Sequence, residues 1–309
     1  MLAGIDVGKW YLDVCIGGER TQRFQNTRQA IGGLITTLNE HNVTRVICEP
    51  TGGYERELVQ TLRTASIQVQ VAHPNKVRAF AQASGVLAKT DRIDARVLYE
   101  YGVVFTGPSR REPSDKVLEL RDILRRRQQL ITTRTREMNR LEKQPTETIR
   151  VSCQRHLEWL SEEIAELDRA VDAQLADIEL KPQIDRYCSV KGVGRLTAAT
   201  LIAELPELGE YDSKSLTALV GLAPWSRDSG KQHGYRAIRG GRMSVRKALY
   251  MAALSTIRWK GPLREFYLRL RERGKPGKVA LVAVMRKLLL YLNAVAHRKT
   301  PWIENPGIT

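Results

Sequence analysis

The sequence has few cysteines, few aromatic residues and no long uninterrupted apolar run. Its four cysteines, Cys15, Cys48, Cys153 and Cys188, are scattered without a Cys-x-x-Cys pair. This spacing excludes a zinc ribbon or a disulfide framework and indicates small buried thiols in a reducing compartment. The five histidines have no metal-ligand partner at helical spacing, so we interpret them as structural or exposed residues.

Export and membrane signals are also missing. The first residues lack the basic start and apolar core of a signal peptide. The longest apolar stretch, residues 279–296, carries Arg286 and Lys287 in its middle, which argues against a membrane span. We therefore expect a cytoplasmic protein without a membrane partner.

Positive charge is abundant and unevenly placed. The 309 residues include 50 basic and 34 acidic ones, a formal net charge of +16. Residues 226–299 hold 19 of the basic residues and only three acids, so the rest of the chain is balanced at 31 of each. A merely solvated basic face would be spread more evenly. The concentrated surplus indicates a polyanionic partner, most often nucleic acid.

The first hundred residues predict a mixed α/β fold. Strands are expected at residues 2–7, 11–16, 20–25, 43–48 and 67–72, and helices at 28–41, 54–64, 75–84 and 91–102. Three strands followed by alternating helices and strands is the element order of an RNase H-like (RuvC-like) fold. We expect this α/β domain to span residues 1–110, although a fold alone says little about function.

Residues 114–180 predict a helical hairpin with coiled-coil seams. Ser114 is suited to start a helix, and Pro145 interrupts the pattern. Apolar residues recur at three-four spacing on both sides of the proline: Val117, Leu120, Leu124, Ile131, Met138 and Leu141, then Leu157, Leu160, Ile164, Leu167, Val171 and Ile178. The first arm is basic and the second acidic, which favours pairing within one chain or between two. We expect a homo-oligomer, a dimer or a tetramer, through this coiled coil.

Residues 181–309 predict a basic, mostly helical C-terminal domain. Its start contains Lys191, Gly192 and Gly194 in a hydrophobic-x-Gly-hydrophobic-Gly pattern before an apolar helix, as in a helix-hairpin-helix. The glycines would let the turn approach a phosphate, and the following helix offers free N–H groups. An ordinary tight turn is the alternative.

Four acids suggest a metal site. Asp6 and Glu49 end apolar strands, and Asp91 and Asp94 share one face at the start of a helix. Carboxylates gathered at one sheet edge would repel each other unless a divalent cation lay between them. Mg²⁺ suits such ligands and phosphodiester chemistry. Alternatively, the two helix acids simply stabilise the helix start and Glu49 is ion-paired.

Several ordered motifs make the sequence similar to a known family. GIDVGK, CEPTGGYE, KTDRIDA, GLAPWSRDSGKQHGYRAIRGGRMSVRKALYMAA and KVALVAVMRKLL resemble the DEDD-type transposases of bacterial insertion sequences, relatives of the pilin-gene inversion recombinase. The resemblance implies a RuvC-like domain, a coiled-coil insertion and a C-terminal transposase domain. For many members it also implies guidance by a non-coding bridge RNA. It further implies a bacterial protein that is associated with the nucleoid when it is bound to DNA.

The resemblance also assigns the reacting residues. It places the four acidic positions of the family on Asp6, Glu49, Asp91 and Asp94, and its nucleophilic serine on Ser229. From the residues alone, Ser226 and Ser244 would be rival candidates. Basic side chains and glycines around Ser229 and in the hairpin are the candidate nucleic-acid contacts: Lys191, Gly192, Gly194, Arg227, Lys231, Arg236, Arg239, Arg242, Arg246 and Lys247.

These observations favour a Mg²⁺-dependent DNA transposase or recombinase that joins strands through a serine-phosphate intermediate. Its partners would be donor and target DNA and a non-coding guide RNA. One alternative is a RuvC-like hydrolytic nuclease or Holliday-junction resolvase, and another is a non-catalytic nucleic-acid-binding regulator. A covalent protein–DNA adduct would distinguish the transposase from the hydrolytic nuclease, and metal-independent function would support the regulator. The Asp-x-Gly of GIDVGK also fits an actin-like sugar kinase, but no second glycine-rich phosphate loop follows.

Overall fold

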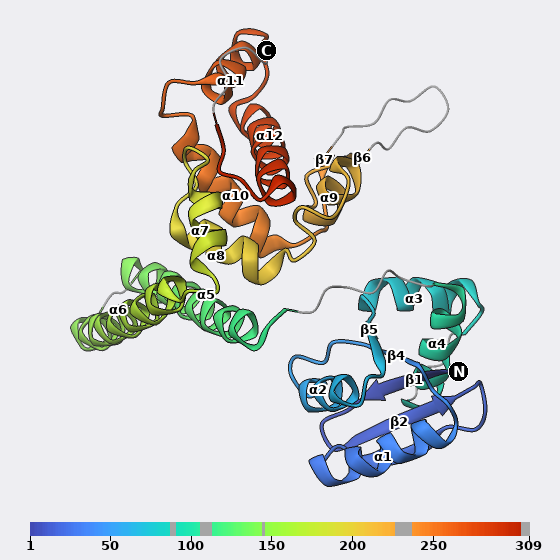
Figure 1. The fold of residues 1–309 in the computed structure, drawn as a ribbon. Helices are drawn as coiled ribbons and strands as arrows, with labels where there is room; N and C mark the ends of the chain where they lie inside the picture. The colour runs from blue at the N-terminus through green and yellow to red at the C-terminus, as the bar shows by residue number, and fades with distance from the viewer. Residues whose placement is uncertain (87–90, 106–112, 144–145, 226–236, 304–309) are drawn as a thin grey trace. The chain divides into compact units, whose positions relative to one another are not determined.

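The computed structural model divides into two compact units, Met1–Arg110 and Arg111–Thr309 (Figure 1). It describes residues 1–86, 91–105, 113–143, 146–225 and 237–303. Among these residues, every buried apolar cluster draws on one unit only. Each unit is therefore held together by a core of its own.

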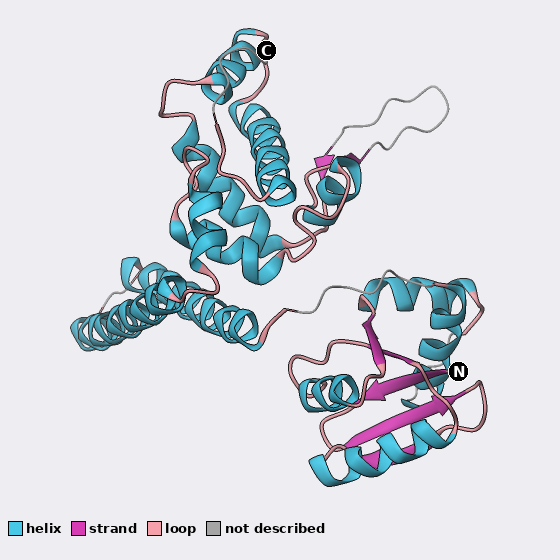
Figure 2. Ribbon diagram, in the orientation of Figure 1, coloured by secondary structure: helices cyan, strands magenta, loops and turns pink. Residues whose placement is uncertain are grey.

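A five-stranded mixed sheet forms the centre of the first unit, with the strand order β3-β2-β1-β4-β5 (Figure 2). The strands are β1 Leu2–Val7, β2 Tyr11–Ile16, β3 Gln22–Gln25, β4 Arg45–Cys48 and β5 Gln68–Val71. Strands β1, β4 and β5 run parallel, and β2 is antiparallel to both β1 and β3. Strand β1 is thus the central strand of the sheet, with β2 on one side and β4 on the other.

Helices cover both faces of this sheet. They are α1 Arg28–Glu40, α2 Arg56–Thr64, α3 Pro74–Ala83 and α4 Asp91–Val104. Because successive strand residues point to opposite faces, Ile5 of β1 packs in the cluster that contains α1 and α2. Ile47 of β4 packs in the cluster that contains α3 and α4. The face on which α4 lies is the face that bears the candidate site.

The elements predicted for the first hundred residues are present with small boundary shifts. Strands β1 and β2 have the predicted bounds. The third strand begins at Gln22 and the fourth at Arg45, each two residues later than predicted. The reason for the fourth is local, since the N–H of Val43 donates to the carbonyl of Leu38 in the turn after α1 and does not join the ladder.

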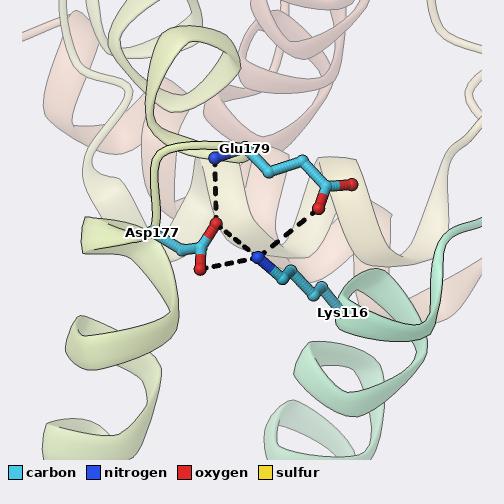
Figure 3. Close-up of polar contacts among 3 residues, drawn as sticks. All are labelled: Lys116, Asp177 and Glu179. Carbon is cyan, nitrogen blue, oxygen red and sulfur yellow. Dashed lines mark hydrogen bonds and ion pairs between the residues drawn. The ribbon is translucent and has the colours of Figure 1, made fainter.

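Helices α5, Asp115–Glu142, and α6, Glu147–Ala176, form an antiparallel hairpin in the second unit. The direction follows from three cross-helix pairs, which are Lys116 with Asp177, Arg127 with Asp168, and Glu137 with His156. Figure 3 shows one end of the hairpin, where Lys116 Nζ lies 2.8 Å from Asp177 and 3.6 Å from Glu179. The oppositely charged arms therefore pair within one chain.

The apolar seam of the hairpin departs from the predicted one. Met138 is 56% exposed, and Ile178, which lies past the end of α6, is 88% exposed. In their place Leu130, which the pattern did not select, is buried with Leu160 and Ile164. The register of the arms decides this, because only residues facing the other arm are covered.

The remaining helices of the second unit form its main core together with the open end of the hairpin. They are α7 Lys181–Cys188, α8 Arg195–Glu204, α9 Ser213–Val220, α10 Met243–Thr256, α11 Pro262–Glu272 and α12 Gly277–Arg298. Among the described helices, α12 alone has the length and hydropathy of a membrane span. However, Leu288, Leu289 and Leu292 of α12 are fully buried in the core, and this packing explains its apolar composition.

Replacing Leu160 and Leu167 together by aspartate is expected to unfold the outer part of the hairpin. Leu160 is only 1% exposed, and Leu167 packs against the same small cluster. An unpaired charge buried there costs several kcal/mol, which so small a cluster does not offset. Circular dichroism should show a loss of helix. Ile178→Asp is the matched control and should change the free energy of unfolding by less than about 0.5 kcal/mol. Full helix content in the double variant would contradict the seam.

Candidate functional site

Two of the predicted acids lie at the same end of the two central strands. Asp6 is near the end of β1, and Glu49 follows directly after β4. The parallel register pairs Ile5 with Cys48, so one further step brings Asp6 level with Glu49. Neighbouring strands are about 4.8 Å apart, and residues in register point to the same face. Both half-buried acids are therefore adjacent on the face covered by α4.

The packing of α4 on β1 fixes the direction of this helix. A Cβ atom added to Gly4 would lie 2.3 Å from the carbonyl oxygen of Ala95. One added to Gly102 would lie 3.0 Å from Leu2 Cδ2. The later part of α4 thus contacts the start of β1, and the two elements run antiparallel. Glycine is required at both positions because any side chain would separate the helix from the sheet.

This direction brings the start of α4 to the end of β1 that carries Asp6. A strand advances about 3.3 Å per residue and a helix about 1.5 Å, so two residues of β1 match four to five residues of α4. Counting from Gly4 and Ala95, the level of Asp6 corresponds to the first turn of α4, which begins at Asp91 and contains Asp94. The backbone of all four predicted acids therefore meets at one end of the sheet.

The side chains give a more limited picture. Asp94 is half-buried, whereas the side chain of Asp91 lies outside the described part of the structure. Among the side chains that are described, no three His, Cys, Asp or Glu residues form a group that could hold a metal ion. The donor chemistry nevertheless fits Mg²⁺, which binds carboxylate oxygens and keeps several waters.

A fifth acid, Asp13, lies beside Asp6 on the same face. It is in register with Asp6 on one side and with Arg23 on the other, and it is 3% exposed. Arg23 Nε and Nη2 donate to its two carboxylate oxygens at 3.1 and 2.8 Å. Asp6 and Asp13 are like charges directly opposite each other, and such pairs destabilise a sheet. The ion pair with Arg23 compensates the charge of Asp13 in this cross-strand row. Sequence reasoning missed Asp13; the signal was a charge inside the apolar strand β2.

The loop after Glu49 is fixed by a second carboxylate. Glu55 Oε2 accepts hydrogen bonds from the backbone N–H groups of Thr51 and Gly53, at 3.0 and 2.8 Å, and from the Thr51 hydroxyl at 2.8 Å. Burial would raise the pKa of Glu55, but these hydrogen bonds together hold that pKa below its usual value. The glutamate that the CEPTGGYE motif adds after Glu49 therefore holds the loop in place.

The segment around Ser229 belongs to the second unit. Arg227, Ser229, Lys231 and Arg236 lie outside the described residues. The chain leaves α9 and enters this segment through β6, Pro224–Trp225, and returns through β7, Ala237–Ile238, which pairs with it antiparallel. The described structure thus defines where the Ser229 segment starts and ends.

Glycines hold this two-stranded ladder against the helical core. A Cβ atom on Gly241 would lie 2.3 Å from the backbone nitrogen of Gly221, and one on Gly221 would lie 2.3 Å from the carbonyl oxygen of Gly240. Both glycines have positive φ angles, 69° and 78°. The close approach for which the sequence suggested a nucleic acid is therefore made, at Gly241, by the backbone of the protein itself.

Two of the predicted nucleic-acid contacts have partners within the protein. The guanidinium of Arg242 donates to both carboxylate oxygens of Glu207, which is 2% exposed, and to the carbonyl oxygen of Glu204. Arg246 donates to the carbonyl of Gly240. These contacts give Arg242 and Arg246 structural roles where the sequence predicted a phosphate. Their neighbours Arg239 and Lys247 are exposed.

Replacing Arg242 by alanine is expected to lower the free energy of unfolding by about 3–5 kcal/mol, because it removes the guanidinium that donates to both carboxylate oxygens of the buried Glu207. Arg239→Ala is the matched control and should change stability by less than about 0.5 kcal/mol. Denaturant unfolding measures both. A double variant, Arg242→Met with Glu207→Leu, should recover most of the loss. Equal stability of Arg242→Ala and Arg239→Ala would contradict the role of the ion pair.

The predicted hairpin joins α7 to α8. Gly192 has a φ of 90°, and a Cβ atom on it would lie 2.1 Å from Thr256 Oγ1 of α10. Its missing side chain is thus explained by packing inside the unit. Gly194 begins α8 without any side-chain cap and has no atom within 4 Å of where its Cβ would be. Lys191 and the start of α8 are the parts of this hairpin that are exposed to solvent.

Comparison with known proteins decides the family. A family model described as "Transposase" matches residues 3–149, and another, described as "Transposase IS116/IS110/IS902 family", matches residues 185–268. The chain belongs to this transposase family. The pilin gene-inverting proteins of Moraxella bovis and Moraxella lacunata are each 27% identical to it, over 97% of this chain and 96% of theirs. The insertion element IS110 43.6 kDa protein of Streptomyces coelicolor is 32% identical over 44% of this chain and 35% of its own length.

The two transposase matches cover the predicted acids of the first unit and the predicted serine of the second. The first includes Asp6, Glu49, Asp91 and Asp94, and the second includes the α7–α8 hairpin and Ser229. The resemblance seen in the sequence motifs is thus confirmed at the level of the family. As an IS110-family transposase or recombinase, the protein belongs to a class of enzymes that act on DNA.

Proposed function

We propose that this transposase cuts and rejoins DNA strands through a phosphoserine at Ser229, with Mg²⁺ held by Asp6, Glu49, Asp91 and Asp94. The observation that carries the proposal is the meeting of Asp6, Glu49 and the start of α4 at one end of the central strands, in a chain of the transposase family. Carboxylates gathered at one edge of a sheet repel each other. A shared cation would remove their mutual repulsion.

The first unit is proposed to be an RNase H-like domain. Support comes from the strand order β3-β2-β1-β4-β5, with parallel β1, β4 and β5 and helices on both faces. We propose that residues 1–110 form this metal-binding domain, residues 114–180 a coiled-coil hairpin, and residues 181–309 the domain with the serine. The antiparallel ion pairs of α5 and α6 support the hairpin.

The chemistry proposed for Ser229 conserves the energy of the phosphodiester bond. Serine Oγ bonds to phosphorus, the bond from phosphorus to the departing deoxyribose oxygen breaks, and the serine proton leaves as that oxygen gains one. Attack by a strand hydroxyl on the phosphoserine then rejoins DNA and restores the serine. Serine is a weak nucleophile at its ordinary pKa, so it requires activation. Bound Mg²⁺ would neutralise developing charge on the phosphate.

The basic residues of the second unit are proposed to hold the nucleic acid. Residues 226–299 carry 19 basic residues against three acids. Of the predicted contacts, Lys191, Arg239 and Lys247 are exposed, and the start of α8 at Gly194 is open. A protein that neutralises several phosphates loses about 10³–10⁵ in affinity between about 50 and 200 mM salt. The proposal predicts that the affinity of this protein for nucleic acid falls equally steeply with salt concentration.

Partners and location follow from the same proposal. We propose donor and target DNA as substrates, a non-coding guide RNA as a partner, an oligomer formed through the hairpin, and action in the bacterial cytoplasm. RNA guidance would leave sequence reading to base pairing, so the protein itself needs to recognise only shape and backbone. Sequencing the RNA that copurifies with the protein tests the guide. Recovery of only random fragments would contradict it.

A nicked suicide substrate tests the proposed reaction. The purified protein is incubated with such DNA and Mg²⁺, and the products are separated on a denaturing gel. A band of protein joined to DNA supports the phosphoserine route. Cleavage without such a band would support the hydrolytic nuclease in its place. Binding without cleavage, unaffected by removal of Mg²⁺, would support a non-catalytic regulator.

A further inference from the structure

The second unit contains a shallow pocket whose lining shares only Lys191 with the predicted nucleic-acid contacts. It is a depression in the surface, and the roughly 310 Å³ of empty space between its walls includes open solvent. Its walls come from the α7–α8 hairpin, the connection between α10 and α11, the first turn of α11, and the segment around α12. Within the described residues, its lining includes three basic side chains, Lys191, Lys260 and Arg264, and no acidic one. Such a lining favours an anionic ligand.

The back of the pocket is rigidly built. Tyr291 of α12 and Trp302 stack with ring centres 4.2 Å apart. The backbone N–H of Trp302 donates to Ser189 Oγ at 2.6 Å. On the other side, Thr256 Oγ1 lies 2.9 Å from the carbonyl oxygen of Lys191, which it reaches because Gly192 has no side chain. These contacts hold four separate segments of the unit around one cavity.

One end of the pocket is suited to a phosphate. Helix α11 begins there, with Gly261 at its N-cap, no side-chain cap, and Pro262 in its first turn. The N–H groups of Leu263 and Arg264 have no acceptor within the helix, since the first intrahelical acceptor, Gly261, is used by Glu265. Free N–H groups and the positive end of the helix dipole attract anions. Lys191 and Lys260 add full charges beside them.

The pocket also offers an aromatic surface. The Trp259 side chain lines the pocket and is 61% exposed, which is unusual for a tryptophan without a partner surface. Arg258 and Lys260 flank it in the chain and are also exposed. An exposed aromatic ring beside phosphate-binding groups is the arrangement by which proteins bind unstacked bases. A base inside a duplex has no free face to stack.

We propose that this pocket binds one unpaired nucleotide, with its base stacked on Trp259 and its phosphate held by Lys191, Lys260 and the start of α11. The inference rests on the proposed function, because cutting and rejoining strands of two duplexes leaves nucleotides transiently unpaired. The nucleotide could come from the DNA strands or from a guide RNA, and both share this chemistry. The pocket would keep the unpaired strand from closing again before rejoining.

Fluorescence anisotropy with labelled oligonucleotides tests the proposal on the full-length protein. The probes are single-stranded DNA, single-stranded RNA of the same sequence, and the corresponding duplex DNA. Trp259→Ala should weaken single-strand binding by about 5- to 150-fold and duplex binding far less. Trp259→Phe should retain most of the affinity, because a smaller ring still stacks. A stronger effect on DNA or on RNA identifies the source of the nucleotide.

Two further variants complete the test. Trp159→Ala removes another exposed tryptophan, on the acidic helix α6, and should leave binding unchanged. Lys260→Gln should lower the slope of log affinity against log salt by about 0.7, the loss of one single-strand phosphate contact. The proposal is overturned if Trp259→Ala binds like Trp159→Ala, if it loses duplex and single-strand binding equally, or if the salt slope of Lys260→Gln is unchanged. Failure of the wild-type protein to bind any nucleic acid would refute the proposed function instead.

Discussion

Ser229→Ala is expected to abolish recombination and the covalent protein–DNA adduct while leaving nucleic-acid binding intact. The serine Oγ would form the covalent bond to the DNA phosphate. Alanine has no side-chain oxygen that could replace it. Removal of a catalytic nucleophile costs roughly 10⁴-fold or more in rate. The readout is the adduct band formed with a nicked suicide substrate, followed by peptide mapping of the linked residue in the wild-type protein.

Two neighbouring serines provide the controls for this prediction. Ser226→Ala and Ser244→Ala should keep the adduct, although Ser226 lies three residues from the proposed nucleophile and Ser244 lies at the exposed start of α10. An adduct mapped to either of them would move the active residue. Robust recombination by Ser229→Ala would remove the serine mechanism and favour hydrolytic cleavage at the acidic site.

Asp6→Asn should eliminate strand exchange without unfolding the first unit. Asparagine has nearly the same shape, and Asp6 is only half-buried at the end of β1. It would remove one negative charge from the row that includes Asp13 and Glu49, so the site would hold a divalent cation at least about 100-fold more weakly. Calorimetric titration of the protein with Mg²⁺ and a recombination assay over a range of Mg²⁺ concentrations measure the two effects.

The control for Asp6→Asn replaces a carboxylate of α4, the helix that covers the candidate site. Glu100 of α4 pairs with Arg96 at 3.0 Å and lies on the surface. Glu100→Gln should therefore bind Mg²⁺ and recombine DNA normally, because a surface pair of this kind contributes little. Wild-type Mg²⁺ binding by Asp6→Asn, with circular dichroism unchanged, would show that the acids of this edge serve another purpose.

Hydrophobic patterning was sufficient for most of the secondary structure. The short apolar runs at residues 2–7 and 11–16 predicted β1 and β2 with their observed bounds. Predicted strand boundaries were wrong where a turn engages the backbone, as at Val43, whose N–H donates to Leu38. Such hydrogen bonds cannot be recognised from the spacing of apolar residues. The predicted apolar seam of the hairpin was wrong at Met138 and Ile178. Spacing shows that a helix has an apolar face, whereas contact with the other arm decides which residues of that face are buried.

The candidate site was only partly predictable for a similar reason. Acids at strand ends and at a helix start pointed to Asp6, Glu49, Asp91 and Asp94, because charges are rare in such apolar surroundings. Asp13 escaped notice, since its significance depends on being opposite Asp6 and next to Arg23. Arg242 was assigned to DNA from its neighbours in the chain, but its buried partner Glu207 is 35 residues away.

The sequence by itself determined the element order of the first unit, the concentration of positive charge in residues 226–299, and the motifs that mark the transposase family. These properties are local or additive, so they can be read along the chain. Only the tertiary structure decided that α4 runs antiparallel to β1 and brings Asp91 to the end of the sheet that carries Asp6. It also decided that Arg242 is held by Glu207 and that Trp259 lines a basic pocket. Each of these depends on contacts between residues far apart in the chain, and packing alone brings such residues together.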